Sequence, residues 1–384
     1  MLSVCETSTL TEAWVWLSCL PSIRNYGKRL ILSRFPDVCA LFGADRSCLQ
    51  RVGIDHPRVL SVLLSPLYRE QAMEILRNTG KLDIRIIHPD HPEFPRLLGH
   101  IPDSPIVLYR RGTWSSARCV AIVGSRRATG YGIGMAERLA ADLASAGFTI
   151  VSGLARGIDT AAHSGALQAG GRTVAVLGNG VECVYPPENR KLAERMLENG
   201  AFLSEYPPGT PPAPFHFPVR NRIVSGLSEA VVVVEAGERS GSLITVQCAL
   251  EQGRDVFAVP GNATSLTSRG CNRLIREGAG LVQEAADILE ALAAERFSDI
   301  LGSGATKTAN STSTASSILS MKHPEPLEIP EQIVYGRLAR EPLTPDQVCA
   351  QSGLAPSEVQ QVLLMLELKH CVMRDADGLV RLIP

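Results

Sequence analysis

Ala230-Val231-Val232-Val233-Val234-Glu235 is the stretch that decides the fold, because its run of valines leaves no polar face to a strand. Strands that are apolar on both faces are typical of parallel sheets covered by helices on either side. A Gly- and Ser-containing loop and a helical pattern over 243–252 follow, and the same alternation recurs. We expect further strands over 119–123, 148–151, 173–177, 201–204 and 255–259, and further helices over 132–146, 159–169, 188–199, 223–227 and 272–277. The pattern predicts an α/β fold, a Rossmann-like doubly wound parallel sheet over 116–297.

Helical patterns fill the N-terminal segment, and we interpret residues 1–80 as a helical, SAM-like module. Helices are expected over 10–19, 28–35, 37–42, 57–64 and 67–78. Gly27 comes late after Pro21 for a helix-hairpin-helix that contacts DNA, so we expect this module to contact protein or to act as a spacer. Residues 81–115 are predicted to be a connector with one short extended piece over 84–88.

The C-terminal part begins with a segment over 298–326 that is rich in Ser, Thr, Gly and Ala, which indicates a flexible linker. Residues 327–384 follow, with the element order of a winged helix-turn-helix domain. Helices are expected over 331–340, 345–352 and 356–369, and a hairpin from 371–374 and 379–383. This domain has five basic and eight acidic side chains. Since a helix that reads DNA needs donors for phosphates and base edges, we favour contact with protein over DNA reading.

The bulk composition excludes several classes of protein. With a net charge of −1 and a pI near 6.7, the chain has no global basic field, so a polyanion would have to bind a local patch. The ten cysteines form no C-x-x-C pair and show no zinc-ligand spacing, which predicts reduced thiols and no metal site. Neither a leader nor an apolar run of membrane-spanning length is evident, so we expect a cytoplasmic protein.

Four loops join predicted strands to predicted helices, at the sheet edge where open α/β folds bind ligands. Three of the four carry an arginine, and all carry glycines that let backbone N–H groups approach an anion. The loops are 123–129, 152–159, 177–180 and 235–242. Together they predict an extended anion-binding rim, with candidate residues Gly124, Ser125, Arg126, Gly153, Arg156, Gly157, Ser240 and Gly241.

A fifth segment, Phe215-His216-Phe217-Pro218-Val219-Arg220-Asn221-Arg222, combines two phenyl rings with two guanidinium groups in a chain that has few aromatics. A ring can stack on a base and a guanidinium can bind a phosphate, so the octet has the parts to hold a nucleic-acid strand. We expect Pro218 to end the incoming chain and a helix to begin near Arg220. Phe217 is the stacking candidate, and Phe215 is predicted to lie in the core.

Cofactor chemistry and catalysis find little support in the sequence. The spacing G-x-G-x-x-G of dinucleotide sites fails, since Met135 and Glu137 occupy the third glycine position in the two possible alignments, and no ATP-binding loop of Walker type exists. We predict no cofactor. His163 is expected to be a packed side chain rather than a general base. Glu235, Glu238 and Glu251 could assist the cleavage of a glycosidic bond, so an enzyme remains the alternative.

The loop sequences together closely resemble the DNA-processing protein A family. The similarity covers about 95–295 and rests on Val-Gly-Ser-Arg, Ser-Gly-Leu-Ala-Arg-Gly-Ile-Asp, His-Phe-Pro-Val-Arg-Asn-Arg and Glu-Ala-Gly-Glu-Arg-Ser-Gly-Ser. It implies a non-enzymatic protein that binds single-stranded DNA in natural transformation, forms homodimers through the Rossmann-like domain, and loads a RecA-type recombinase past single-strand-binding protein. The dimer contact is expected over 270–281.

The resemblance also implies roles for single residues. Arg126, with Gly124 and Ser125, would hold one phosphate, and Gly153, Arg156 and Gly157 the next. Arg220 and Arg222 would reach the DNA backbone, Asn221 would order the turn or meet a base edge, and Phe217 would stack on a base. Two alternatives stay open: a Rossmann-type phosphoribohydrolase, although Thr245 stands where that class carries a glutamate, and a duplex-binding regulator that uses the winged helix.

Overall fold

The computed structural model describes residues 7–114, 118–302 and 343–352, together with 338, 359, 362–363, 366, 372–374 and 379–382. The chain divides into two compact units, Met1–Ala305 and Thr306–Pro384, and each contains its own hydrophobic core. None of the helices within these described ranges is long and apolar enough to cross a membrane.

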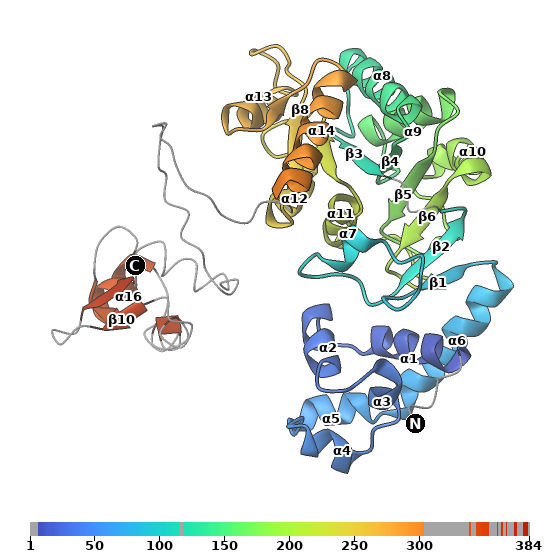
Figure 1. Ribbon diagram of the computed structural model, residues 1–384, viewed down its shortest axis with the longest axis vertical. Helices are drawn as coiled ribbons and strands as arrows, with labels where there is room; N and C mark the ends of the chain where they lie inside the picture. The colour runs from blue at the N-terminus through green and yellow to red at the C-terminus, as the bar shows by residue number, and fades with distance from the viewer. Residues whose placement is uncertain are drawn as a thin grey trace. The chain divides into compact units, whose positions relative to one another are not determined.

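In the described part of the first unit, a nine-stranded sheet forms the centre (Figure 1). The strand order is β1-β2-β6-β5-β4-β3-β7-β8-β9. In this order, all neighbouring pairs from β6 onward are parallel, whereas β1 pairs antiparallel with β2, and β2 antiparallel with β6. The strands are β1 Arg85–Ile87, β2 Leu108–Gly112, β3 Cys119–Val123, β4 Thr149–Ser152, β5 Thr173–Leu177, β6 Ala201–Ser204, β7 Ala230–Val233, β8 Asp255–Ala258 and β9 Gly280–Leu281. The predicted α/β, doubly wound fold is confirmed.

Helices cover both faces of this sheet, because its central strands are apolar on both sides. In β3, Val120 and Ile122 pack with α8, α9 and α14, while Ala121 and Val123 pack in the core that contains α11, α12 and α13. The helices are α7 Arg96–Gly99, α8 Gly130–Ser145, α9 Ile158–Gln168, α10 Arg190–Asn199, α11 His216–Gly226, α12 Ser242–Glu251, α13 Arg269–Arg276 and α14 Ala285–Gly302, with a 3-10 turn at Pro187–Asn189. The chain winds from β3 to β6 in one direction and from β7 to β9 in the other, so the switch point lies between β3 and β7.

The segment that the sequence predicts as a connector contributes β1 and β2 to the sheet. β2 pairs with β6 over Tyr109–Gly112 and with β1 over Leu108–Arg110. Arg110 makes β2 look polar in the sequence, yet it is buried, and Glu93 lies 3.2 Å from its guanidinium group. Because the neutralising carboxylate belongs to a different part of the segment, the local pattern does not reveal this strand.

The N-terminal module packs directly on the sheet domain. Its core contains Trp16, whose ring meets Phe42 edge-on at 5.3 Å, and the same apolar cluster continues into Phe202 of β6. Trp14 Nε1 donates to the Asp90 carboxylate at 2.9 Å. The helices are α1 Thr7–Cys19, α2 Asn25–Leu32, α3 Val38–Phe42, α4 Arg46–Arg51, α5 Pro57–Leu63 and α6 Pro66–Lys81, of which α4 was not expected.

In the second unit, the described elements are α16 Pro345–Ser352, β10 Val372–Arg374 and β11 Val380–Leu382. The two strands pair antiparallel, as the hairpin of a winged helix requires. The helices expected over 331–340 and 356–369 lie outside the described residues except at single positions. Helix α14 reaches Gly302, so it covers the first residues of the predicted linker; the linker beyond 302 lies outside the described part.

Among the described cysteines, Cys39 departs from the sequence-based prediction. Free thiols are found at Cys19, Cys48, Cys183, Cys248, Cys271 and Cys349. Burial raises the pKa of Cys271 to about 12, so this thiol stays protonated and unreactive at neutral pH. Cys39 is disulfide-bonded, and the expectation that all cysteines are reduced is therefore wrong there.

Candidate nucleic-acid interface

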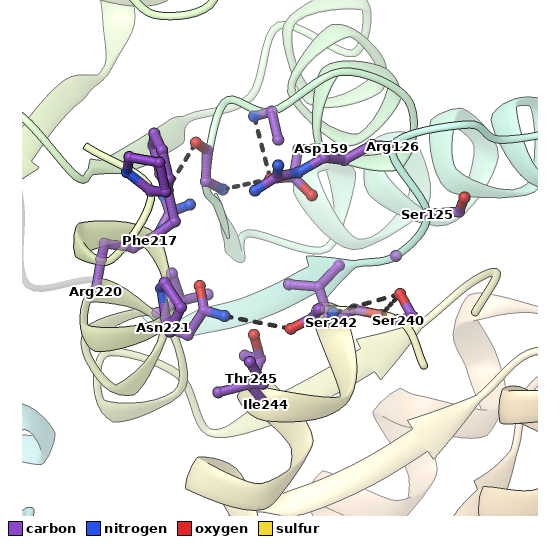
Figure 2. A pocket seen from close by; sticks show the side chains of 18 of the residues that line it. Ser125, Arg126, Asp159, Phe217, Arg220, Asn221, Ser240, Ser242, Ile244 and Thr245 are labelled. Atoms are coloured by element: carbon purple, nitrogen blue, oxygen red, sulfur yellow. Dashed lines mark hydrogen bonds between the residues drawn. The ribbon is translucent and has the colours of Figure 1, made fainter. Parts of the chain in front are cut away.

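A pocket of about 550 Å³ opens at the switch point, beside the carboxyl ends of β3 and β7. The loops after β3, β4 and β7 and the first turns of α11 form its walls. In Figure 2, Asp159 and Arg126 lie on the side opposite to Thr245 and Ile244. Nine of the predicted site residues line the pocket, namely Gly124, Ser125, Arg126, Gly153, Phe217, Arg220, Asn221, Ser240 and Gly241. Arg156, Gly157 and Arg222 do not belong to this lining.

The loop after β3 carries the accessible positive charge. Arg126 and Arg127 are both exposed, and within the described residues no carboxylate lies at ion-pair distance from either. The Arg126 guanidinium carbon lies 5.6 Å from the centre of the Phe217 ring, within the range of a cation–π contact. The Ser125 hydroxyl accepts from the Arg127 N–H at 3.0 Å and shapes the turn. This loop can therefore present guanidinium groups to an anion.

The loop after β4 differs from the predicted phosphate-binding loop, because two of its backbone N–H groups already donate to the Asp159 carboxylate. The Asp159 carboxylate accepts from the N–H groups of Gly153 and Ala155 at 3.1 and 3.2 Å. Burial raises the pKa of Asp159, while Arg220 and these N–H groups act in the opposite direction. Arg156 makes an ion pair with Glu188 on the surface instead of facing the pocket. Two backbone N–H donors and the arginine of this loop thus already have partners within the protein.

The packing of the loops requires glycine at positions 157 and 153. Gly157 has a φ of +75°, and a Cβ there would meet the Ser125 carbonyl oxygen, so only glycine lets the second loop pack on the first. A Cβ on Gly153 would meet the Arg220 guanidinium group. Both glycines are therefore required for the close packing of these loops and of α11.

Helix α11 begins at His216, seven residues before the helix predicted over 223–227 and four before the start expected near Arg220. Pro218 lies in its first turn, where a missing N–H costs nothing. Arg220 lines the pocket but is buried, and its guanidinium group donates to the carbonyl groups of Gly153 (2.9 Å) and Val176. Burial lowers the pKa of Arg220 to about 10, against the effect of Asp159. Arg220 thus ties α11 to β5 and to the second loop.

Arg222 points away from the pocket, contrary to the expectation that it reaches DNA. Its guanidinium group donates to both Glu205 carboxylate oxygens at 2.8 Å and to the Asp103 carboxylate at 2.9 Å. Burial lowers the pKa of Arg222, but Glu205 and Asp103 together outweigh it and raise the pKa above its ordinary value. Successive residues of an α-helix are turned by about 100° about its axis. Arg222 therefore faces a different side from Asn221, and that side carries the two carboxylates.

Of the two phenyl rings of the octet, Phe217 lies at the pocket as expected, whereas Phe215 does not lie in the core. Phe217 lines the pocket and is half-buried, with its ring stacked on Tyr185 at 5.7 Å. Phe215, predicted to lie in the core, is 71% exposed, so that prediction is wrong. It precedes the first turn of α11, where the side chain projects beyond the packed face of the helix.

The loop after β7 brings hydroxyl groups to the opposite wall. The hydroxyls of Ser240 and Ser242 lie 2.8 Å apart, and Asn221 Nδ2 donates to the Gly241 carbonyl at 3.4 Å, as Figure 2 shows. Asn221 thereby joins α11 to the start of α12. Sequence reasoning did not select several lining residues, Arg127, Tyr185, Pro214, Ile244 and Thr245, although Arg127 belongs to the predicted loop over 123–129.

The acidic residues considered for catalysis lie outside the pocket lining. The buried Glu235 carboxylate accepts from the Thr129 N–H at 2.8 Å and so stabilises the start of α8. Glu251 accepts from Gln247, and Glu238 lies 4.0 Å from Arg269. His163 is fully buried against Thr173, with its pKa lowered to about 3 by burial, which confirms a packed histidine. Among the described residues, no group of three acidic, His or Cys side chains could hold a metal ion.

The fold and the pocket define a Rossmann-like protein with an arginine-bearing cleft at the switch point of its sheet. The chain belongs to the DNA recombination-mediator protein A family, whose sequence model matches residues 85–293, and the model of the DprA winged helix domain matches 320–378. The family predicted from the loop motifs is thereby confirmed.

Similar proteins agree with this membership. The DNA processing protein DprA of Bacillus subtilis is 43% identical over 239 residues, which is 62% of this chain and 75% of that protein. The X-ray structure of DprA from Streptococcus pneumoniae superposes with a TM-score of 0.62 at 36% identity, over 73% of this chain and 97% of the other. A structure of DprA from Helicobacter pylori, described for its single-stranded DNA binding mode, gives 0.50 at 29% identity, over 55% and 96%.

Proposed function

We propose that this chain binds single-stranded DNA in the switch-point pocket and acts as a recombination mediator in natural transformation. The observation that carries the proposal is the position of the exposed Arg126, which has no carboxylate partner among the described residues, over the Phe217 ring at 5.6 Å, in a pocket lined by serine hydroxyls. A single strand offers phosphates and bare base faces, so a guanidinium group beside an accessible ring suits both. The single-stranded DNA binding mode described for the Helicobacter pylori relative supports the same ligand.

Within the pocket we assign different roles to the residues. Arg126, with Ser125 and Gly124, binds a phosphate, and the hydroxyl of Ser240 and the amide of Asn221 donate from the opposite wall. Phe217 stacks on a base. Arg220 acts as a positioning residue, because its guanidinium group is already bonded to the carbonyl groups of Gly153 and Val176. We exclude Arg156 and Arg222 from the DNA contacts, since both are engaged in ion pairs.

The test is the salt dependence of oligothymidylate binding by the full-length protein. For single strands, each phosphate contact contributes about 0.7 to the slope of log K against log salt. Arg126→Ala should lower affinity and reduce the slope by about that amount. Arg195→Ala, which removes an exposed charge from α10, is the control and should leave both values unchanged. If Arg126→Ala binds like the parent protein, this pocket is not the DNA site.

We infer that the pocket binds without catalysing a reaction. Asp159 is the carboxylate in its lining, and two backbone N–H groups together with nearby Arg220 already engage it. Thr245 lines the pocket where the related phosphoribohydrolases carry a glutamate. Incubation with nucleoside monophosphates and measurement of free base tests this inference. Release of base that Asp159→Asn abolishes would contradict it.

Partners of the complex follow from the proposed role. The family's description as a recombination mediator supports a RecA-type recombinase and single-strand-binding protein as partners in the cytoplasm. We propose a homodimer through residues 270–281, where Leu281 is exposed on the edge strand β9. Leu281→Glu should convert the dimer to a monomer in sedimentation velocity. A monomeric parent protein, or an unchanged mass of the variant, would reject this contact.

We further propose that 327–384 forms a separate winged helix domain that contacts protein, beyond a linker over 298–326, with 1–80 as the helical module. The acidic excess of the terminal domain supports protein contact over groove binding. Deletion of 327–384 should leave affinity for single strands unchanged. Loss of duplex affinity on that deletion would instead favour the DNA-reading alternative.

A further inference from the structure

Three aromatic side chains lie in successive ring contact next to the pocket, and we name them the aromatic ridge: Tyr206, His216 and Phe215. The rings of Tyr206 and His216 stack at 4.0 Å with an angle of 28°, and Phe215 meets His216 edge-on at 4.4 Å. His216 Nδ1 lies 2.9 Å from the Gly178 carbonyl oxygen, so the middle ring can donate a hydrogen bond that fixes its orientation. The orientation of the ridge is therefore fixed by the protein, and the ridge ends in the exposed Phe215 ring.

The ridge lies between two pockets that share helix α11. Phe217 lines the switch-point pocket, whereas Tyr206 lines a second pocket of about 440 Å³, together with Val219 and Arg222 of α11. His216 and Phe215, next to Phe217 in the chain, connect the two by ring contact. A strand that leaves the first pocket at Phe217 would thus cross the ridge on its way to the second.

The negative charge of the second pocket is compensated by Arg222 and by the nearby buried Lys28. Its two carboxylates, Glu205 and Asp103, are both paired with Arg222. Arg24, at the start of α2, lines the same pocket and is exposed. Within the described ranges, no carboxylate lies at ion-pair distance from Arg24, so its guanidinium group can accept a phosphate as partner.

We propose that the aromatic ridge is a second base-stacking subsite for single-stranded DNA, and that Arg24 binds a phosphate of the strand beyond it. The proposal rests on the proposed function, because the strand must first occupy the switch-point pocket. Phe215 offers its ring to a base, since stacking needs an exposed π-face and no particular base identity. The N-terminal module thereby contributes one cation to the DNA path.

The experiment compares oligothymidylates of about 4 and about 16 nucleotides, lengths that span the usual site sizes of single-strand binders. Phe215→Ala should weaken binding of the long oligonucleotide by about fivefold, or about 1 kcal/mol at 1.4 kcal/mol per factor of ten, and leave the short one unchanged. Phe215→Trp should keep the affinity, because it retains a ring. Leu250→Ala removes an exposed apolar side chain outside both linings and serves as the control.

Arg24 is tested by the same length comparison. Arg24→Ala should reduce the salt slope for the long oligonucleotide only, whereas Arg46→Ala, an exposed charge on α4 of the same module, should change neither. Unchanged binding of both lengths by Phe215→Ala overturns the ridge. A change of oligomeric state in Phe215→Ala also overturns it, because a second copy of the chain would then cover the ring. If the parent binds neither length, the proposed function itself fails.

Discussion

Arg222→Met should distinguish the structural role of Arg222 from the DNA-binding role proposed for Arg126, through its effect on stability. The substitution removes a guanidinium group that donates to both Glu205 oxygens at 2.8 Å and to Asp103 at 2.9 Å, while an unbranched side chain keeps most of the volume. Arg222 is 8% exposed and the Glu205 side chain 19%, so the Glu205 carboxylate would stay nearly buried without its main partner.

The expected cost follows from this burial. Breaking a buried ion pair from one side costs about 3–5 kcal/mol, because the remaining charge is desolvated and unpaired. The Asp103 side chain is 51% exposed and can be hydrated again, and Asn25 still donates to Glu205 at 2.7 Å. We therefore expect the free energy of unfolding to fall by about 3 kcal/mol, at the lower end of that range.

Urea unfolding of the full chain measures this change, and oligothymidylate binding is measured on the same samples without denaturant. Arg126→Ala should give the opposite result, with a stability change within about 0.5 kcal/mol and a clear loss of affinity. Arg222→Met combined with Glu205→Gln should recover part of the stability, because the charge of the less exposed carboxylate is removed and Asp103 can be hydrated. If Arg222→Met loses DNA affinity while keeping the parent's stability, Arg222 contacts DNA and the reasoning is refuted.

Three further predictions concern the pocket and the core. Gly157→Ala should lower the unfolding free energy by about 1–3 kcal/mol, because its φ of +75° and the nearby Ser125 carbonyl both disfavour a Cβ; equal urea midpoints would contradict this. Phe217→Ala should weaken oligothymidylate binding by about 1–3 kcal/mol without changing the salt slope, and Phe217→Trp should retain binding; a changed slope would indicate a lost phosphate contact instead. The neutral His163 should stabilise the fold fully above pH 6.5 and progressively less towards pH 3, because burial lowers its pKa to about 3 from the ordinary 6.5 and the unfolded chain takes the proton first. Urea unfolding across this pH range should show that the unfolding free energy of His163→Gln depends less on pH than that of the parent. An equally steep dependence would exclude His163 as the cause.

The fold could be predicted from the sequence where burial leaves a local pattern. The strands over 119–123, 173–177 and 201–204 match the structure to the residue, because each is an apolar run buried on both faces. β2 was missed because its buried Arg110 depends on Glu93, a partner outside the strand. The start of α11 was placed too late, since Pro218 was interpreted as a stop although the first helical turn accepts proline.

The site could be predicted as a set of loops but not as a set of contacts. The strand-to-helix junctions meet at one edge because parallel strands share a direction, and this explains why nine predicted residues line one pocket. Whether an arginine faces the pocket depends on carboxylates that come from distant segments. Glu188 binds Arg156, and Glu205 and Asp103 bind Arg222, whereas Arg126 has no such neighbour among the described residues. The spacing of residues within the loops does not indicate these distant partners.

Helix α11 has different partners on its two sides, and this restricts how its length can vary. Phe217, Arg220 and Asn221 face the switch-point pocket, while Val219 and Arg222 line the cavity against the N-terminal module. Each residue of a helix turns it by about 100°, so one inserted or deleted residue would rotate every later side chain away from its partner. Arg220 would leave the carbonyl groups that bind it, and Arg222 would leave its two carboxylates. A single substitution in α11 therefore affects one side of the helix, whereas a change of its length would disturb the pocket and the domain contact together.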